Sequence, residues 1–227
     1  MQNSYQPPRQ FMAFPPVIKN LLIINGLVFF AQAVPATDAL LTYWFALWPF
    51  GTPDIVRTPS GLRELGNFYP WQLITYGFLH GGVGHILMNM FILWMFGVRV
   101  ENSWGSRRFA IYYFVCVIGA GLAQLTFSAI TGNIFTPTVG ASGGVMGILL
   151  AFGMMYPDEY IYLYFFVPVK TKYFVVFLAL LDLFSGLTRP GSGVAHFAHL
   201  GGMFIGFILI LYWLGKLPIQ PKQRMYW

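Results

Sequence analysis

The stretch HGGVGHILMNMFILWMFGV, residues 80–98, contains no Asp, Glu, Lys or Arg and becomes almost wholly apolar after its first few positions. An α-helix needs about 20 apolar residues to cross the hydrocarbon core of a bilayer, which is about 30 Å thick. The stretch therefore predicts a transmembrane helix. Its opening turns carry three polar side chains, those of His80, His85 and Asn89. His85 and Asn89 are four positions apart and would share one face of the helix.

The whole chain has the composition of a membrane protein. Of its 227 residues, 57% are hydrophobic and 9% are charged, whereas about 25% of the residues in soluble domains are charged. We expect an all-α, polytopic membrane protein with six spans, placed near residues 17–34, 84–100, 109–130, 141–156, 173–187 and 194–214. The expected organisation is a cytoplasmic N-terminal tail of residues 1–16, a six-helix domain of residues 17–214 and a cytoplasmic C-terminal tail of residues 215–227.

Basic residues indicate the orientation of these spans. With the N-terminus inside, the inner loops and tails carry Arg9, Lys19, Arg99, Arg107, Arg108, Lys170, Lys172, Lys216, Lys222 and Arg224. The outer side keeps only Arg57, Arg63 and Arg189. This excess of Lys and Arg on one side is the positive-inside pattern, so we expect both termini in the cytoplasm. Because the basic residues are scattered among apolar segments, the net charge of +6 does not indicate a nucleic-acid partner.

The first outer loop, at about residues 35–79, contains the uncharged aromatic segment LLTYWFALWPF at residues 40–50. Trp and Tyr rings concentrate at membrane–water interfaces. We expect this segment to lie at the interface, and a water-exposed loop with a few aromatic residues is the alternative.

Polar residues of three spans are expected at one depth in the membrane. The span at 84–100 opens with His85 and Asn89, the span at 141–156 opens with Ser142, and the last span opens with His199. All three spans run from outside to inside, so their first turns lie near the outer face. A polar side chain inside a span is costly and points to function. Four such positions at a shared depth predict a single site between helices.

Ser142 and His199 together indicate nucleophilic catalysis. A serine hydroxyl is a weak nucleophile until a base takes its proton, and a neutral imidazole suits that task. Ser142 would begin a helix, where free backbone N–H groups favour negative charge. His85 and Asn89 would add donors to an oxyanion formed during acyl transfer.

Glycines near these residues are expected to bring the helices together. Gly143 and Gly147 are small residues four apart, and so are Gly202 and Gly206. Such pairs let transmembrane helices approach closely, which would deliver the serine to the histidine.

Each polar residue also has a simpler interpretation when taken alone. Ser142 could be a packing residue that bonds its own helix, and Asn89 could join two helices by a hydrogen bond. Asp182 would pair with His196 or Arg189 near the outer surface, and we do not assign it as a third catalytic residue.

The histidines raise the alternative of a metal site. The segment HFAH at residues 196–199 places two imidazoles three apart, and His80 and His85 could complete a ligand set. The chain has no HExxH motif, and no carboxylate lies near in sequence to serve as ligand or base. We therefore expect no metal and no cofactor, and we interpret His80 and His196 as structural or interfacial residues.

Several motifs resemble those of the rhomboid intramembrane serine proteases. GASGG at residues 140–144 matches their GxSG motif, HILMN at 85–89 their HxxxN motif, and AHLGGMFIG at 198–206 their AHxxGxxxG motif. The loop GVRVENSWGSRRF at 97–109 resembles a family pattern through Gly97, Glu101, Gly105 and Arg108. The four motifs occur in order on the expected spans, and the similarity extends over residues 17–214.

The resemblance implies a six-helix bundle with a water-filled cavity open to the outer side. It implies Ser142 as nucleophile and His199 as general base, working as a dyad with no acidic third member. His199 is chosen over His196 because only His199 has glycines at the motif's offsets. The oxyanion hole would consist of His85, Asn89 and the Ser142 backbone N–H. The supporting residues would be Gly140, Gly143, Gly202 and Gly206. The fifth span would act as a substrate gate.

Two positions depart from the family pattern. Many members have Trp-Arg in the first outer loop, where this chain has Trp71-Gln72, and loss of the arginine is expected to loosen that loop. Many members also have an aromatic residue four positions after the serine, where this chain has Met146. We expect the orientation of His199 to rely on other residues.

The sequence therefore predicts a serine endopeptidase that cuts in or near the outer part of a substrate's transmembrane segment. The expected partners are transmembrane protein substrates and membrane lipids. The alternatives are a catalytically silent relative that binds or moves transmembrane clients and a small-solute transporter. The expected location is a bacterial inner membrane, with an organelle as the other possibility.

Overall fold

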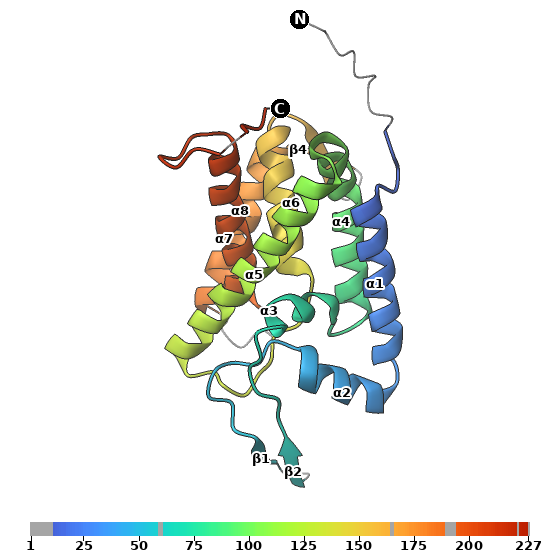
Figure 1. The fold of residues 1–227 in the computed structure, drawn as a ribbon, viewed down its shortest axis with the longest axis vertical. Helices are drawn as coiled ribbons and strands as arrows, with labels where there is room; N and C mark the ends of the chain where they lie inside the picture. Colours follow the sequence, from blue (N-terminus) through green and yellow to red (C-terminus); the bar gives the residue numbers. More distant parts are fainter. Residues whose placement is uncertain (1–10, 59–60, 164–165, 189–193, 222, 227) are drawn as a thin grey trace, which may run out of the picture.

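A computed structural model describes residues 11–58, 61–163, 166–188, 194–221 and 223–226. The chain forms a helical bundle with two short β-hairpins, as Figure 1 shows. The helices are α1 (Pro16–Gln32), α2 (Pro35–Phe45), α3 (Gln72–Thr75), the 3₁₀ turn η1 (Tyr76–Phe78), α4 (Val83–Trp104), α5 (Ser106–Thr131), α6 (Ser142–Met155), α7 (Thr171–Thr188) and α8 (His196–Trp213).

The apolar helices of the structure coincide with the six predicted spans. Four of them, α4, α5, α7 and α8, are long and apolar enough to cross a membrane, while α1 and α6 are shorter apolar helices. The outward faces of the bundle are apolar too, with exposed side chains such as Leu27, Phe30, Phe184 and Phe204. A soluble bundle would place charged residues on those faces. The predicted helical membrane fold is therefore confirmed in class, and the count of six spans stays a prediction.

The two hairpins were not predicted. Strands β1 (Ile55–Thr58) and β2 (Gly61–Glu64) pair antiparallel within the first outer loop. Strands β3 (Tyr160–Leu163) and β4 (Val167–Lys170) pair antiparallel between α6 and α7. Four residues are too few for an alternating pattern to stand out, so sequence reasoning treated both segments as plain loops.

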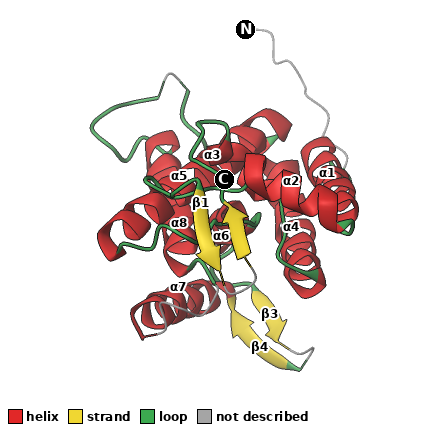
Figure 2. Cartoon of the chain, turned by 90° about the horizontal axis from the view of Figure 1, so that it is seen from below, coloured by secondary structure: helices red, strands yellow, loops and turns green. Residues whose placement is uncertain are grey.

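Helix α6 lies in the middle of the bundle and packs against α4, α5, α7 and α8. Figure 2 shows the helices from the end that carries the first hairpin, and α1 lies at the periphery next to α4. In Figure 1 the chain before α1 and the chain after α8 leave at the same end, opposite α2 and the β1–β2 hairpin. The location of both termini in the cytoplasm stays a prediction. Arg9, Arg189 and Lys222, which entered the charge argument, lie outside the described residues.

Glycines set the close contact of α6 with α8, as expected. A Cβ atom added to Gly202 would lie 2.1 Å from the carbonyl oxygen of Gly143. A Cβ atom on Gly143 would in turn lie 2.3 Å from Cβ of Ala120 on α5. No side chain fits at either position, so the two backbones touch directly.

The carboxylate of Glu101, near the end of α4, caps the start of α1. Its oxygens accept hydrogen bonds from the backbone N–H groups of Val17 at 2.9 Å and Ile18 at 2.8 Å. The hydroxyl of Ser106 donates to the same carboxylate at 2.6 Å. Helix α1 has no side-chain cap of its own at Pro15. Glu101 is 1% exposed, and it therefore satisfies buried donors that water does not reach.

Replacing Glu101 with alanine is expected to destabilise the protein by about 2–4 kcal/mol, because one buried backbone donor, one part-buried backbone donor and one hydroxyl lose their acceptor. Thermal unfolding in detergent measures the effect. The control is Glu64→Ala, on an exposed strand of the first hairpin, where a change within about 0.5 kcal/mol is expected. Equal melting of the two variants would contradict the capping role.

The structure shows the contacts of Gln72, which stands where many members of the family have arginine. The Gln72 side chain is fully buried. Its Oε1 accepts from the backbone N–H of Trp48 at 3.2 Å, and its Nε2 donates to the carbonyl of Asn67 at 2.9 Å and to that of Trp44 at 3.3 Å. Glutamine therefore joins three parts of the first outer loop, and the expected loosening of this loop stays a prediction.

Candidate active site

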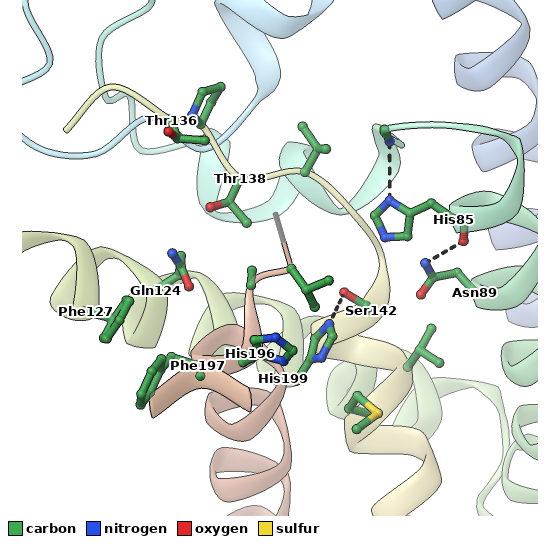
Figure 3. Close-up of a pocket in the computed structure, with 18 of the residues that line it drawn as sticks. His85, Asn89, Gln124, Phe127, Thr136, Thr138, Ser142, His196, Phe197 and His199 are labelled. Atoms are coloured by element: carbon green, nitrogen blue, oxygen red, sulfur yellow. Dashed lines mark hydrogen bonds between the residues drawn. The ribbon is translucent and has the colours of Figure 1, made fainter. Parts of the chain in front are cut away.

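A cavity of about 670 Å³ lies between α4, α5, α6, α7, α8 and the segment 132–141. Its lining includes Ser142, His199, His85 and Asn89. The four residues predicted to share one depth thus meet in one cavity, as the close-up in Figure 3 shows. Each comes from the first turns of its helix. The four residues therefore lie together as predicted, while their depth in a membrane and their roles remain predictions.

Ser142 and His199 are hydrogen-bonded. The distance between His199 Nε2 and Ser142 Oγ is 2.8 Å. Ser142 is the first residue of α6, and His199 lies in the first turn of α8. The direct contact of these helices at Gly143 and Gly202 brings the two side chains within reach. An imidazole nitrogen at this distance is placed to accept a proton from the serine hydroxyl.

The segment before Ser142 is held by the first outer loop. Leu47 and Thr138 exchange two backbone hydrogen bonds, of 3.0 Å and 2.9 Å. The N–H of Gly140 donates to the carbonyl of Tyr76 at 2.9 Å. These bonds fix the entry of the chain into α6 and so the position of the serine at its start.

Gly140 and His85 are in close contact beside the serine. Gly140 has φ of +128°, a conformation that other residues rarely adopt. A Cβ atom there would lie 2.8 Å from His85 Nε2 and 3.6 Å from Ser142 Oγ. The absence of a side chain at Gly140 therefore lets the Nε2 edge of the imidazole approach the serine.

The hydrogen bonds of His85 indicate which nitrogen carries its proton. The N–H of Gly81 donates to His85 Nδ1 at 3.3 Å. A neutral imidazole has one bare nitrogen and one N–H. With Nδ1 as acceptor, Nε2 carries the hydrogen, and it is available as a donor on the side of Ser142.

One N–H group of the Asn89 side-chain amide is hydrogen-bonded within its own helix. Its Nδ2 donates to the carbonyl of His85, one turn earlier, at 2.9 Å. A primary amide has two N–H groups, so this bond orients the side chain and leaves a second donor. Asn89 is 5% exposed and lines the cavity.

Asp182 of α7 is the residue that sequence reasoning undervalued. Its Oδ1 lies 2.6 Å from Nδ1 of His196, which is the pairing predicted for these two residues. Its two oxygens also lie 3.2 Å and 3.1 Å from Nδ1 of His199. The expected Ser142–His199 dyad had no acidic third member. In the structure, the Asp182 carboxylate contacts Nδ1 of His199, the ring nitrogen that does not contact Ser142. Arg189, the other partner considered, lies outside the described residues.

The metal hypothesis drew on a different set of side chains. It joined His80 and His85 to the two histidines of α8. Among the described residues, the structure instead brings possible ligand atoms of Asp182, His196 and His199 within 4.8 Å of one another. The metal hypothesis did not include Asp182, because this residue is separated in sequence from both histidines of the cluster.

His80 is a buried neighbour of His85 and does not line the cavity that contains Ser142. It precedes α4, is 3% exposed, and its ring lies 5.1 Å from that of His85 in an edge-to-face arrangement. Burial, together with the neighbouring His85, lowers the pKa of His80 to about 4. His80 is therefore neutral near pH 7, in agreement with its interpretation as a structural residue.

Comparison with known proteins identifies the family that the sequence motifs resemble. The model of the Rhomboid domain matches residues 67–216. RHOMBOID-like protein 4 of Arabidopsis thaliana is 35% identical over 140 residues, which are 61% of this chain and 33% of that protein. Rhomboid protein 1, mitochondrial, of Saccharomyces cerevisiae is 30% identical over 155 residues, 67% of this chain and 44% of that protein. Rhomboid protease GluP of Bacillus subtilis is 31% identical over 137 residues, 60% of this chain and 25% of that protein.

The chain spans between a quarter and about half of the length of these relatives. The matched domain nevertheless includes α4, α5, α6, α7 and α8, and with them the whole cavity described above. With a matching domain over most of its length and membrane-type apolar helices, this integral membrane protein belongs to the rhomboid family.

Proposed function

We propose that the protein is an intramembrane serine endopeptidase. The observation that carries this proposal is the 2.8 Å distance between His199 Nε2 and Ser142 Oγ inside a cavity among the apolar helices. Nucleophile and base within hydrogen-bond reach are the arrangement that acyl transfer requires.

The proposed reaction begins at Ser142. His199 takes the proton of the hydroxyl while Oγ attacks the carbonyl carbon of the substrate peptide bond. The tetrahedral oxyanion is stabilised by the Ser142 backbone N–H at the start of α6, by Nε2–H of His85 and by the free amide N–H of Asn89. His199 then protonates the leaving amine, and the acyl group stays on Ser142 Oγ. In the second half of the reaction, His199 takes a proton from water while the water oxygen attacks the acyl carbon. His199 returns that proton to Ser142 Oγ as the carboxylic acid product leaves.

The proposed substrates are transmembrane segments of other proteins, reached through the surrounding lipid. A helical peptide bond is shielded by its own turn and must unwind before Oγ can reach its carbonyl carbon. Gly, Pro or small polar residues near the cut lower the cost of that unwinding. The mechanism uses only side chains and backbone groups of the chain, and it calls for neither a metal nor a cofactor.

The test is cleavage-site mapping on a panel of transmembrane segments with purified protein in lipid vesicles. The proposal expects cleavage near the outer end of one or more segments by the wild type and intact segments with Ser142→Ala. Binding of segments without cleavage by the wild type would instead favour a catalytically silent member of the family.

The relatives support membership of the family more directly than they support one particular cellular membrane. They include a mitochondrial protein of Saccharomyces cerevisiae and a protein of Bacillus subtilis. The predicted bacterial inner membrane therefore gains no support over an organelle membrane, and expression of a tagged chain with fractionation of the host membranes distinguishes the two.

A further inference from the structure

We propose that Asp182 is a positioning residue for His199, so that this chain works with a Ser–His–Asp arrangement rather than with an isolated pair. The inference rests on the proposed protease function and deepens it. It arises from the contacts at Nδ1 of His199, the ring nitrogen that faces away from Ser142.

Asp182 reaches His199 from a neighbouring helix. It lies on α7, which packs against α8. Both of its oxygens contact His199 Nδ1, at 3.2 Å and 3.1 Å. The two side chains are largely buried, with 13% of the Asp182 side chain and 15% of the His199 side chain exposed. A carboxylate contact in such surroundings is screened far less than a surface ion pair.

The second histidine of α8 holds the carboxylate in place. His196 Nδ1 lies 2.6 Å from Asp182 Oδ1, and its side chain is 12% exposed. His196 and His199 are three positions apart and therefore lie on one face of α8. The carboxylate bridges the two rings, which restricts its own rotation and fixes its distance from His199.

The carboxylate selects the tautomer that a general base needs. An ionised carboxylate only accepts hydrogen bonds, so the contacting Nδ1 of His199 must carry a hydrogen. In the neutral ring Nε2 is then bare, and Nε2 is the atom that lies 2.8 Å from Ser142 Oγ. Without the carboxylate, the ring is free to place its hydrogen on Nε2, where it cannot accept the serine proton.

The same carboxylate stabilises the charge that forms on His199 during the reaction. The titratable groups that face the His199 ring among the described residues are Asp182 from α7, His196 from α8 and His85 from α4. Of these, only Asp182 supplies a negative charge. It also supplies what an aromatic residue at position 146 is expected to provide in other family members, a fixed orientation of the imidazole. Met146 itself belongs to the buried apolar core and lines the cavity.

The experiment compares wild type, Asp182→Asn, Asp182→Glu and Asp158→Asn in lipid vesicles, with a segment that the wild type cleaves. Asp158 is the matched control because its exposed carboxylate pairs with Lys170 and Lys172 between α6 and α7, away from the cavity. The readouts are kcat and KM across a pH series, together with thermal unfolding of each variant.

We expect Asp182→Asn to lower kcat by about 10²–10⁴-fold with little change in KM, because the general base loses its tautomer and its counter-charge. Asp182→Glu is expected to restore part of kcat, because a carboxylate is again available to Nδ1 of His199, while Asp158→Asn matches the wild type.

A purely structural role would lower thermal stability and activity together, without a selective loss of kcat in a fully folded variant. The inference is therefore overturned if folded Asp182→Asn keeps the wild-type kcat, or if Asp182→Glu is no faster than Asp182→Asn. Loss of wild-type activity in EDTA and its recovery with Zn²⁺ would also overturn it, because the three clustered groups would then hold a metal. Failure of the proposed function itself is distinct, since the wild type would then cleave no segment or would not need Ser142.

Discussion

Ser142→Ala and His199→Ala are each expected to reduce cleavage of a transmembrane substrate by about 10³–10⁶-fold, and the double variant is expected to be no slower than either. The reason is that the serine and the histidine act as one unit through their 2.8 Å contact. When one member is lost, the other has no partner to act on, so the effects do not add. Initial rates in vesicles measure the three variants under identical conditions.

The matched control for these substitutions is Ser103→Ala. Ser103 lies at the far end of α4 from His85 and contacts only the hydroxyl of Tyr156, at 3.0 Å, among the described hydrogen bonds. It is expected to keep wild-type rates. Multiplicative losses in the double variant would show that Ser142 and His199 act separately, which is contrary to the proposed mechanism.

Gly202→Ala is expected to destabilise the bundle by about 3 kcal/mol or more and to lower cleavage at least 100-fold. The added Cβ atom would lie 2.1 Å from the carbonyl oxygen and 2.8 Å from the carbonyl carbon of Gly143. Backbone atoms cannot rotate away as a flexible side chain can, so α8 must shift relative to α6. That shift separates His199 from Ser142, because each lies within one turn of the contact.

Gly26→Ala provides the matched control on α1, where an added Cβ atom meets nothing within 4 Å. It is expected to leave activity unchanged and to raise stability by up to about 1 kcal/mol through better helix propensity. Thermal unfolding and initial rates measure both variants. Wild-type stability and rates in Gly202→Ala would contradict the account of how the site is assembled.

The features that could be predicted from the sequence are those fixed by hydropathy and chain direction. Apolar runs located α1, α4, α5, α6, α7 and α8 but not α2 or α3, which lie in the predicted first outer loop. The alternation of direction predicted that Ser142, His199, His85 and Asn89 share one depth. Depth along the membrane normal follows from position in a span alone. The structure brings these four residues to one cavity, which is the proximity that a shared depth predicts.

Other features depend on how the helices rotate about their axes. Asp182 lies toward the outer end of its span, like the other site residues, yet sequence could not tell that its carboxylate points at His199 rather than at lipid. The same limit explains Gln72, whose three hydrogen bonds join loop segments distant in sequence. The orientation of His199 beside Met146 could be understood only when α7 and α8 were seen together.

The most direct measurement of the central claim is covalent labelling with a fluorophosphonate, followed by peptide mass spectrometry. The account predicts an adduct on the peptide that contains Ser142 in the wild type, and no adduct there in His199→Ala. The adduct forms only if the serine hydroxyl is activated, so it reports the Ser142–His199 pair without any knowledge of the substrate. Equal labelling of Ser142 in wild type and His199→Ala, or an adduct on a different residue, would contradict the account.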